Sequence, residues 1–162
     1  MSVQGVRKLF CDAGLEELVL YSEVVSDTVE NAAAMIGCEP CQIAKTMSFL
    51  LEDMPIVIVA SGDAKIDNGK YKAEFATKAK MIPYGEVEGY TGHLPGGVCP
   101  FALKEGVTVF LDESLKRFDV VYTGGGDEHN TVKVTLSQLE QYSNYKKWVD
   151  VCKNWNDEGA LE

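Results

Sequence analysis

The sequence lacks any apolar run long enough to cross a lipid bilayer. Its longest apolar stretches, such as Pro55–Ala60, are the size of a β-strand, whereas a transmembrane helix needs about 18 or more apolar residues. The segment Met1–Phe10 is amphipathic and has no continuous apolar stretch of the kind that a signal peptide carries. We therefore expect a cytoplasmic protein with no membrane partner.

Positive charge is also scarce. Fifteen Lys and Arg residues stand against 25 Asp and Glu residues, which gives a formal net charge of −10 at pH 7. Non-specific nucleic-acid binding depends on neutralising phosphates, so this balance argues against DNA or broad RNA binding. It still allows contact with one end of an RNA. The segment Lys65–Lys80 carries five lysines against Asp67 and Glu74, and is either a solvated helix face or a contact for phosphates.

The cysteines indicate neither disulfides nor a metal site. There are five, an odd number, and reduced thiols are the default in a cytoplasmic chain. Cys38 and Cys41 have redox spacing, but they follow a predicted helix, whereas thioredoxin-type pairs sit at a helix N-terminus that lowers the thiol pKa. A zinc site would need two further ligands, and the sequence has no second C-x-x-C or paired histidine. We expect structural cysteines, with redox or metal binding as the alternative, and no cofactor.

Nucleotide-binding glycine motifs are missing as well, since neither G-x-G-x-x-G nor G-K-S/T occurs. Gly124–Gly126 do follow a predicted strand, and consecutive glycines can let main-chain N–H groups approach an anion. The next predicted element is a strand rather than a helix. We therefore interpret these glycines as a turn that some other group approaches closely.

No repeat, low-complexity tract or linker divides the chain, which predicts a single domain over residues 1–162. Helices are expected over residues 3–13, 27–36, 68–78, 84–90, 135–142 and 145–155, and strands over 15–22, 44–51, 56–60, 107–111, 120–123 and 131–135. Asp27 with Glu30, and Thr135 with Gln138, have capping-box spacing. The irregular interleaving, with a hairpin over 44–60, indicates a mixed α/β (α+β) sheet packed by helices rather than a doubly wound parallel sheet.

Two candidate centres of chemistry stand out. Lys45 begins the apolar strand Thr46–Leu51, and is either a snorkelling edge residue or a cation aimed into a pocket, where it would bind a phosphate or polarise an ester carbonyl. Cys99, with His93 or His129 as a base, could form a nucleophilic pair. The residue pattern alone leaves these interpretations open.

Short motifs also follow one another in a fixed order over residues 20–142. They are Ala44–Thr46, Val59–Asp63, Lys65–Asp67, Gly89–Gly92, Pro95–Phe101, Val109–Leu115 and Gly124–Asp127. This ordered set resembles the YbaK/EbsC family of aminoacyl-tRNA deacylases, which includes the editing insertion of bacterial prolyl-tRNA synthetase and its free-standing relatives. The predicted helix over 145–155 lies outside the pattern.

The resemblance implies a compact, partly closed mixed sheet packed by helices. It implies hydrolysis of the ester between a wrongly attached small amino acid and the terminal adenosine of tRNA-Pro or a related tRNA, without metal or organic cofactor. Lys45 would hold the 3′ end, and the loop at Gly96 and Gly97 would shape the pocket and supply main-chain donors. The other residues expected to contact substrate are Thr46, Val98, Cys99, Pro100, Gly125 and His129.

The chemistry suits a sparse site. An aminoacyl ester is already activated, so a positioned water and a few hydrogen-bond donors to the oxyanion can accelerate its hydrolysis substantially. The expected partners are the acceptor end of a mischarged tRNA and an aminoacyl-tRNA synthetase. Two alternatives stay open: a non-catalytic module of the same fold that binds tRNA or a synthetase, and a thiol hydrolase that depends on Cys99.

Overall fold

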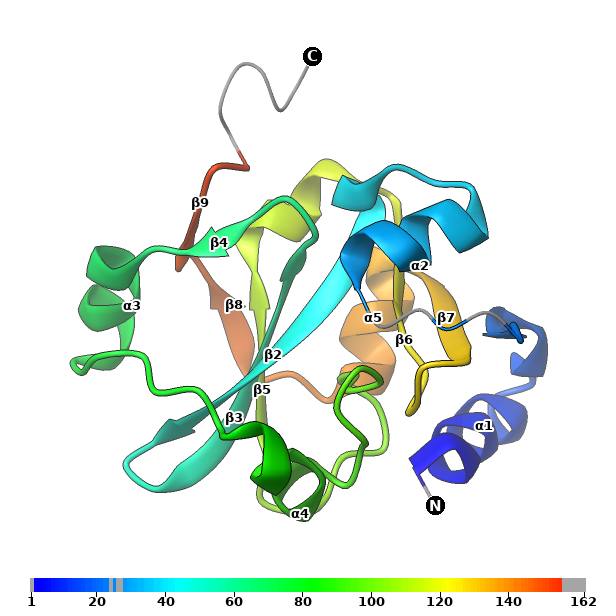
Figure 1. The fold of residues 1–162 in the computed structure, drawn as a ribbon, viewed down its shortest axis with the longest axis horizontal. Coiled ribbons are helices and arrows are strands. Elements are labelled where there is room, and N and C mark those ends of the chain that lie inside the picture. Colours follow the sequence, from blue (N-terminus) through cyan, green and yellow to red (C-terminus); the bar gives the residue numbers. More distant parts are fainter. Residues whose placement is uncertain (1, 24, 26–27, 156–162) are drawn as a thin grey trace.

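The computed structural model describes residues 2–23, 25 and 28–155 (Figure 1). The helices are α1 (Ser2–Asp12), α2 (Val29–Ile36), α3 (Asn68–Phe75), α4 (Val87–Thr91) and α5 (Leu136–Ser143). The strands are β1 (Val19–Tyr21), β2 (Ile43–Leu51), β3 (Met54–Ser61), β4 (Lys65–Ile66), β5 (Thr108–Asp112), β6 (Val120–Gly124), β7 (Asn130–Thr135), β8 (Lys147–Val149) and β9 (Cys152–Lys153). Short 3-10 turns cover Glu16–Leu18, Pro40–Gln42, Tyr84–Glu86 and Glu113–Arg117.

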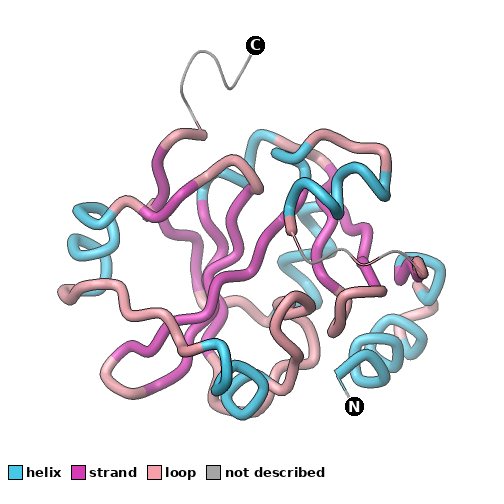
Figure 2. Tube along the Cα trace, in the orientation of Figure 1, coloured by secondary structure: helices cyan, strands magenta, loops and turns pink. Residues whose placement is uncertain are grey.

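One seven-stranded sheet forms the centre of the molecule, in the order β1-β7-β6-β2-β3-β5-β8. The hairpin β2–β3 and the pairs β6–β7 and β1–β7 are antiparallel, whereas β2–β6, β3–β5 and β5–β8 are parallel. β4 and β9 form a separate antiparallel pair. Figure 2 shows the strands at the centre with helices around them. The mixed sheet packed by helices that the sequence predicts is confirmed.

Both faces of the sheet are buried. Val57 and Val59 of β3 pack with α1 and α5 on one face, while Ile56 and Ile58 pack with Tyr71 of α3 on the other. Side chains alternate between the faces of a strand, so a strand covered on both sides is apolar throughout. This explains the continuous apolar run of β3. Because Ile43 of β2 packs against α2, α2 and α3 cover the same face.

The last part of the described chain corrects one prediction. The helix expected over residues 145–155 is wrong, because this segment forms β8 and β9. Asn144 takes a left-handed conformation that ends α5, and β8 then pairs in parallel with β5. The carboxylate of Asp112 accepts the main-chain N–H of Val151 at 2.9 Å. The edge of β5 and the buried carboxylate of Asp112 offer hydrogen bonds to an extended segment. These partners are distant in sequence, so the helical spacing of residues 145–155 does not indicate them.

Other boundaries differ in smaller ways. The strand expected over residues 15–22 begins as a 3-10 turn and is extended only over β1. α3 ends at Phe75, three residues earlier than expected, because Ala76 adopts a left-handed conformation. The predicted capping box at Thr135 and Gln138 is confirmed. Asp27, the predicted cap of α2, lies outside the described residues, and in the structure Thr28 accepts the N–H of Asn31.

Candidate functional site

A cavity of about 190 Å³ opens where β2 and β6 part. The two strands are paired over Ile43–Ala44 and Tyr122–Thr123, and the residues that follow on β2 and β6 border the cavity. Its lining residues are Thr28, Val29, Ala32, Ile43, Ala44, Lys45, Thr46, Gly96, Val98, Tyr122, Thr123, Gly124 and Thr131. Because the strands separate here, side chains from both faces of β2 border the same space.

The ammonium of Lys45 is held by the turn after β3. Nζ donates to the main-chain oxygens of Gly62, at 3.4 Å, and Ala64. An ammonium has three N–H donors, so these two bonds leave one for a ligand in the cavity. Burial lowers the pKa of Lys45 below its usual range, because desolvation disfavours the charged form. Lys45 therefore combines a half-buried positive charge with a spare donor.

The turn that holds Lys45 is itself placed by a close approach of two main chains. A β-carbon on Gly62 would lie 2.1 Å from the main-chain oxygen of Pro40 and 2.7 Å from Cγ1 of Val29. Only glycine fits at this position without movement of its neighbours. Gly62 thus packs the lysine-binding turn against α2, which forms one wall of the cavity.

Thr46 follows Lys45 on β2, so its side chain points to the opposite face of the sheet. Its partner in register is Val59, which packs on the face covered by α1 and α5. The Oγ1 of Thr46 is buried and has no hydrogen-bond partner among the described residues. Buried hydroxyl groups usually have a partner. Because Thr46 lines the cavity, the spare hydroxyl is available to a ligand.

The wall of the cavity opposite α2 is the loop at residues 96–98. Its main chain packs directly against the main chain of the glycine turn at residues 124–126, at the end of β6. The N–H of Gly126 donates to the oxygen of Gly97 at 2.9 Å, and a β-carbon on Gly97 would lie 2.2 Å from the main-chain nitrogen of Asp127. The close approach that the sequence predicts at Gly124–Gly126 is therefore made by the loop itself. Gly96, with φ at 88°, and Val98 line the cavity from this loop.

The structure brings only part of the predicted site together. Lys45, Thr46, Gly96 and Val98 line the cavity. Other predicted residues are not among its lining residues in the described part of the chain: Gly97, Cys99, Pro100, Gly125 and His129. Of these, Gly97 supports the loop from behind. A β-carbon on Gly125 would lie 2.8 Å from Asn130, so Gly125 has a packing role.

The two histidines are engaged in local structure. Nδ1 of His129 lies 3.0 Å from the main-chain oxygen of Ser22, and its ring stacks on Tyr21. His93 is completely buried, and its Nε2 lies 2.7 Å from the main-chain oxygen of Phe101. Carbonyl oxygens accept, so each of these ring nitrogens is the donor. Desolvation lowers the pKa of His93, which keeps that ring neutral.

Cys99 is buried behind the loop. Its Sγ lies 3.6 Å from Nε2 of His93 and from the main-chain oxygen of Phe101. Burial raises the pKa of the Cys99 thiol to about 12, so at neutral pH it is an uncharged thiol. The active nucleophile of a cysteine enzyme is the thiolate. This geometry does not favour nucleophilic catalysis by Cys99.

Several lining residues were not predicted. They come from the start of α2 and from strands on either side of the split: Thr28, Val29, Ala32, Ile43, Ala44, Tyr122, Thr123, Gly124 and Thr131. The sequence carried little signal for them, because Thr131 lies in a strand that also carries Asn130, Lys133 and Thr135, and the burial of Thr123 and Thr131 is known only from the structure. Their convergence depends on the strand order.

Cys38 and Cys41 are free and half-buried. Desolvation is the main cause that raises the pKa of both thiols. Over residues 2–23, 25 and 28–155, no group of three or more His, Cys, Asp or Glu side chains is placed to hold a metal ion. None of the helices within these residues has the length and apolar character that a membrane span requires.

Within the described residues, a mixed sheet packed by helices parts around a cavity that contains a lysine ammonium and a hydroxyl without a hydrogen-bond partner, which defines the protein as a small α/β domain. The comparison with known families is more specific. The chain belongs to the aminoacyl-tRNA editing domain family, whose model matches residues 24–142. The resemblance drawn from the sequence motifs is thereby confirmed.

Individual relatives agree with this assignment. The protein YwhH of Bacillus subtilis (strain 168) is 46% identical over 156 residues, which is 96% of this chain and 99% of that protein. A proline–tRNA ligase of Limosilactobacillus fermentum is 29% identical over 107 residues, covering 62% of this chain but 19% of the ligase. A solved structure of a candidate trans-editing enzyme for prolyl-tRNA synthetase superposes with a TM-score of 0.83 at 25% identity, covering 94% and 98% of the two chains.

Proposed function

We propose that this protein is a trans-editing hydrolase that cleaves the ester bond of a mischarged aminoacyl-tRNA. The observation that carries the proposal is that the Lys45 ammonium and the Thr46 hydroxyl, which has no hydrogen-bond partner in the described part of the chain, line the same cavity. Family membership supports the reaction type. The likeness to proline–tRNA ligases favours tRNA-Pro or a related tRNA, and a cytoplasmic location where such tRNAs are charged.

The size of the cavity favours a small amino acid. Its volume of about 190 Å³ is below the roughly 300–1,000 Å³ of pockets that hold drug-sized ligands. It suits an aminoacyl group, with the rest of the tRNA outside. The apolar part of the cavity wall is formed by Val98, Ile43 and Ala32. Such a wall sterically excludes amino acids with larger side chains but discriminates weakly among small ones.

In the proposed mechanism, the spare donor of Lys45 binds the 3′ end of the substrate. The hydroxyl of Thr46 and main-chain donors of the loop at Gly96 orient the carbonyl and stabilise the oxyanion. A water oxygen attacks the carbonyl carbon, the bond to the ribose oxygen breaks, and that oxygen takes up a proton. No protein nucleophile is needed because the ester is already activated. This agrees with the burial of Cys99 away from the cavity.

A panel of mischarged tRNAs tests the proposal. Wild-type protein should release a small amino acid from at least one of them, and Lys45→Ala should lose at least about 100-fold in kcat/KM, the scale of losing one group that stabilises the transition state. Lys146→Ala is the matched control, since Lys146 is an exposed lysine away from the cavity. Retention of activity by folded Lys45→Ala would contradict the assigned site. If tRNA binds but no member of the panel is deacylated, the alternative of a non-catalytic binding module replaces the enzyme.

A further inference from the structure

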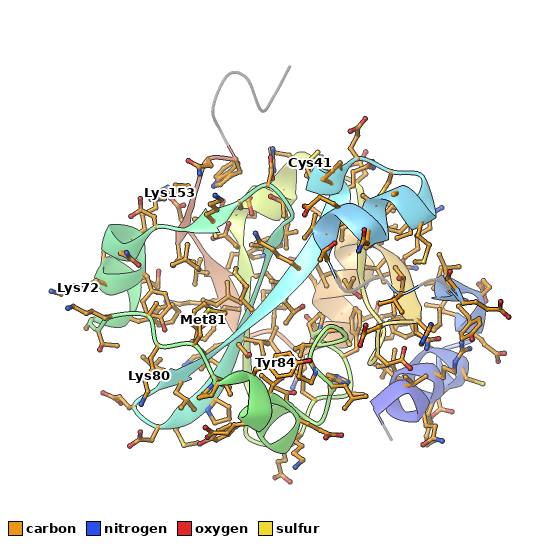
Figure 3. The ribbon with its side chains drawn as sticks, in the orientation of Figure 1. Cys41, Lys72, Lys80, Met81, Tyr84 and Lys153 are labelled. Carbon is orange, nitrogen blue, oxygen red and sulfur yellow. The ribbon has the colours of Figure 1, made fainter. Side chains whose placement is uncertain are left out.

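One side of this acidic protein carries exposed lysines without acidic partners. We call Lys65, Lys72, Lys78, Lys80 and Lys153 the lysine arc, because Figure 3 shows its members Lys153, Lys72 and Lys80 following one another along one edge of the molecule. None of the five has a carboxylate within salt-bridge distance among the described residues. The chain as a whole has a net charge of −10, so this clustering is local.

Three acidic side chains near α3 have partners outside the lysine arc. Asp67 accepts the main-chain N–H of Lys70 at 2.9 Å. Asp150 pairs with Lys70, and Glu74 pairs with Lys147. The five lysines of the arc therefore form no ion pair among the described residues, and Asp67 interacts with Lys153 only at longer range.

Two members of the arc are placed directly opposite each other. Lys65 on β4 and Lys153 on β9 are partners in an antiparallel register, and like charges in this arrangement are destabilising. The same end of the arc approaches the cavity. Burial is the main cause that lowers the pKa of Lys45, and the charge of Lys65 acts in the same direction. An anionic ligand would relieve the repulsion between Lys65 and Lys153.

At its other end the arc meets two exposed apolar side chains. Tyr84 is 79% exposed and Met81 is 62% exposed, and Figure 3 shows Met81 between Lys80 at the edge and Tyr84 nearer the middle of the view. The segment is firmly held, because Leu50 donates to the oxygen of Lys80 at 2.8 Å. The exposed ring of Tyr84 therefore stands on a fixed support.

That support is continuous with the wall of the cavity. Ile82 and Val87, on either side of Tyr84, form a cluster with Leu50 of β2, and Val98 packs against this cluster. Val98 also lines the cavity. The Leu50, Ile82 and Val87 cluster, which supports Tyr84, is thus separated from the proposed site by the side chain of Val98.

We propose that the lysine arc and Tyr84 form a binding surface for the acceptor arm of tRNA, with lysines on backbone phosphates and the Tyr84 ring stacked on an unpaired base that precedes the terminal adenosine. The inference rests on the proposed function. Positive grooves with exposed aromatic rings are the usual way to bind single-stranded nucleic acid. A protein partner is less well matched, because interfaces between proteins are depleted in lysine.

The first test measures kinetics on two substrates. On mischarged tRNA, Tyr84→Ala should lower kcat/KM by about 5-fold to 150-fold, the range expected when one stacked base loses its aromatic partner, while Tyr84→Phe should keep the wild-type value. On the corresponding 3′-aminoacyl adenosine, which has no phosphates or neighbouring bases, both variants should match wild type. Equal losses on the two substrates, or no loss on tRNA, would overturn the proposal.

The second test measures binding of uncharged tRNA and does not require catalysis. The double variants K72A/K80A and K65A/K153A should bind more weakly and show a shallower dependence of log K on log salt, by roughly 0.7 for each single-strand phosphate that is no longer neutralised. Lys146→Ala should behave as wild type. If wild-type protein binds tRNA but deacylates nothing, only the proposed function fails. If the lysine variants bind tRNA normally, or lose only binding to prolyl-tRNA synthetase, the surface is not an RNA site.

Discussion

Gly97 and Asp127 pack so closely that a β-carbon on Gly97 would lie 2.2 Å from the main-chain nitrogen of Asp127. Gly97 does not line the cavity, but it fixes the distance between the loop that does and the glycine turn after β6. The hydrogen bond from the N–H of Gly126 to the oxygen of Gly97 depends on the same approach. The loop is therefore positioned by this main-chain contact in addition to its buried side chains Cys99 and Phe101.

Replacing Gly97 by Ala should consequently displace the loop. We expect a loss of about 1–3 kcal/mol in the free energy of unfolding, typical of overpacking, and a fall in kcat/KM on mischarged tRNA. Gly89→Ala is the control, since a β-carbon there meets nothing within 4 Å. Urea denaturation and deacylation kinetics measure the two effects. Wild-type stability and activity in Gly97→Ala would show that the loop is not held in this way.

Thr46→Val should separate stability from function. Valine is close to threonine in shape but lacks the buried Oγ1, which has no partner within the described chain. The folded protein therefore loses no hydrogen bond, and its free energy of unfolding should stay the same or rise. If the hydroxyl binds substrate, kcat/KM should fall about 2-fold to 10-fold, the equivalent of one hydrogen bond of about 0.5–1.5 kcal/mol. Unchanged kinetics would remove Thr46 from the site.

Cys99 should be dispensable for the chemistry. With a pKa of about 12 and complete burial, its thiol should not react with iodoacetamide at neutral pH, whereas the exposed Cys11 should. Mass spectrometry of the alkylated protein identifies the modified residues, and its deacylase activity should persist. Cys99→Ser should keep most of the activity as well. A folded but inactive Cys99→Ser would instead support the thiol hydrolase.

The charge of Lys45 should leave a signature in the pH dependence of stability. Its folded-state pKa is lowered by burial, so between that value and the ordinary 10.5 the unfolded chain binds more protons than the folded one. The free energy of unfolding contributed by this group therefore rises with pH across that window. Compared with Lys45→Met, wild type should gain stability as the pH rises toward 10.5. The activity that depends on the charged form should fall over the same window.

Urea denaturation of both proteins at several pH values measures this difference. Parallel pH profiles would mean that the Lys45 ammonium is fully solvated. Lys146→Met is a suitable reference, because Lys146 is exposed and its replacement should leave the profile unchanged.

The sequence alone determined the features that depend on near neighbours. The β2–β3 hairpin follows from two apolar runs around a turn, and the capping box at Thr135 follows from the spacing to Gln138. Ordered motifs were enough to recognise the family and to select Lys45. The hairpin and the capping box are determined by residues a few positions apart, and the family motifs can be recognised in the sequence without knowledge of the fold.

Only the tertiary structure decided which of the selected residues share a cavity. Cys99 and Val98 are adjacent in the loop, yet one is buried behind it and the other lines the cavity. The segment after Asn144 has helical spacing but becomes β8 because the edge of β5 offers it hydrogen bonds. Strand order, close main-chain approach and the burial of single side chains are set by partners distant in sequence, and local patterns do not record them.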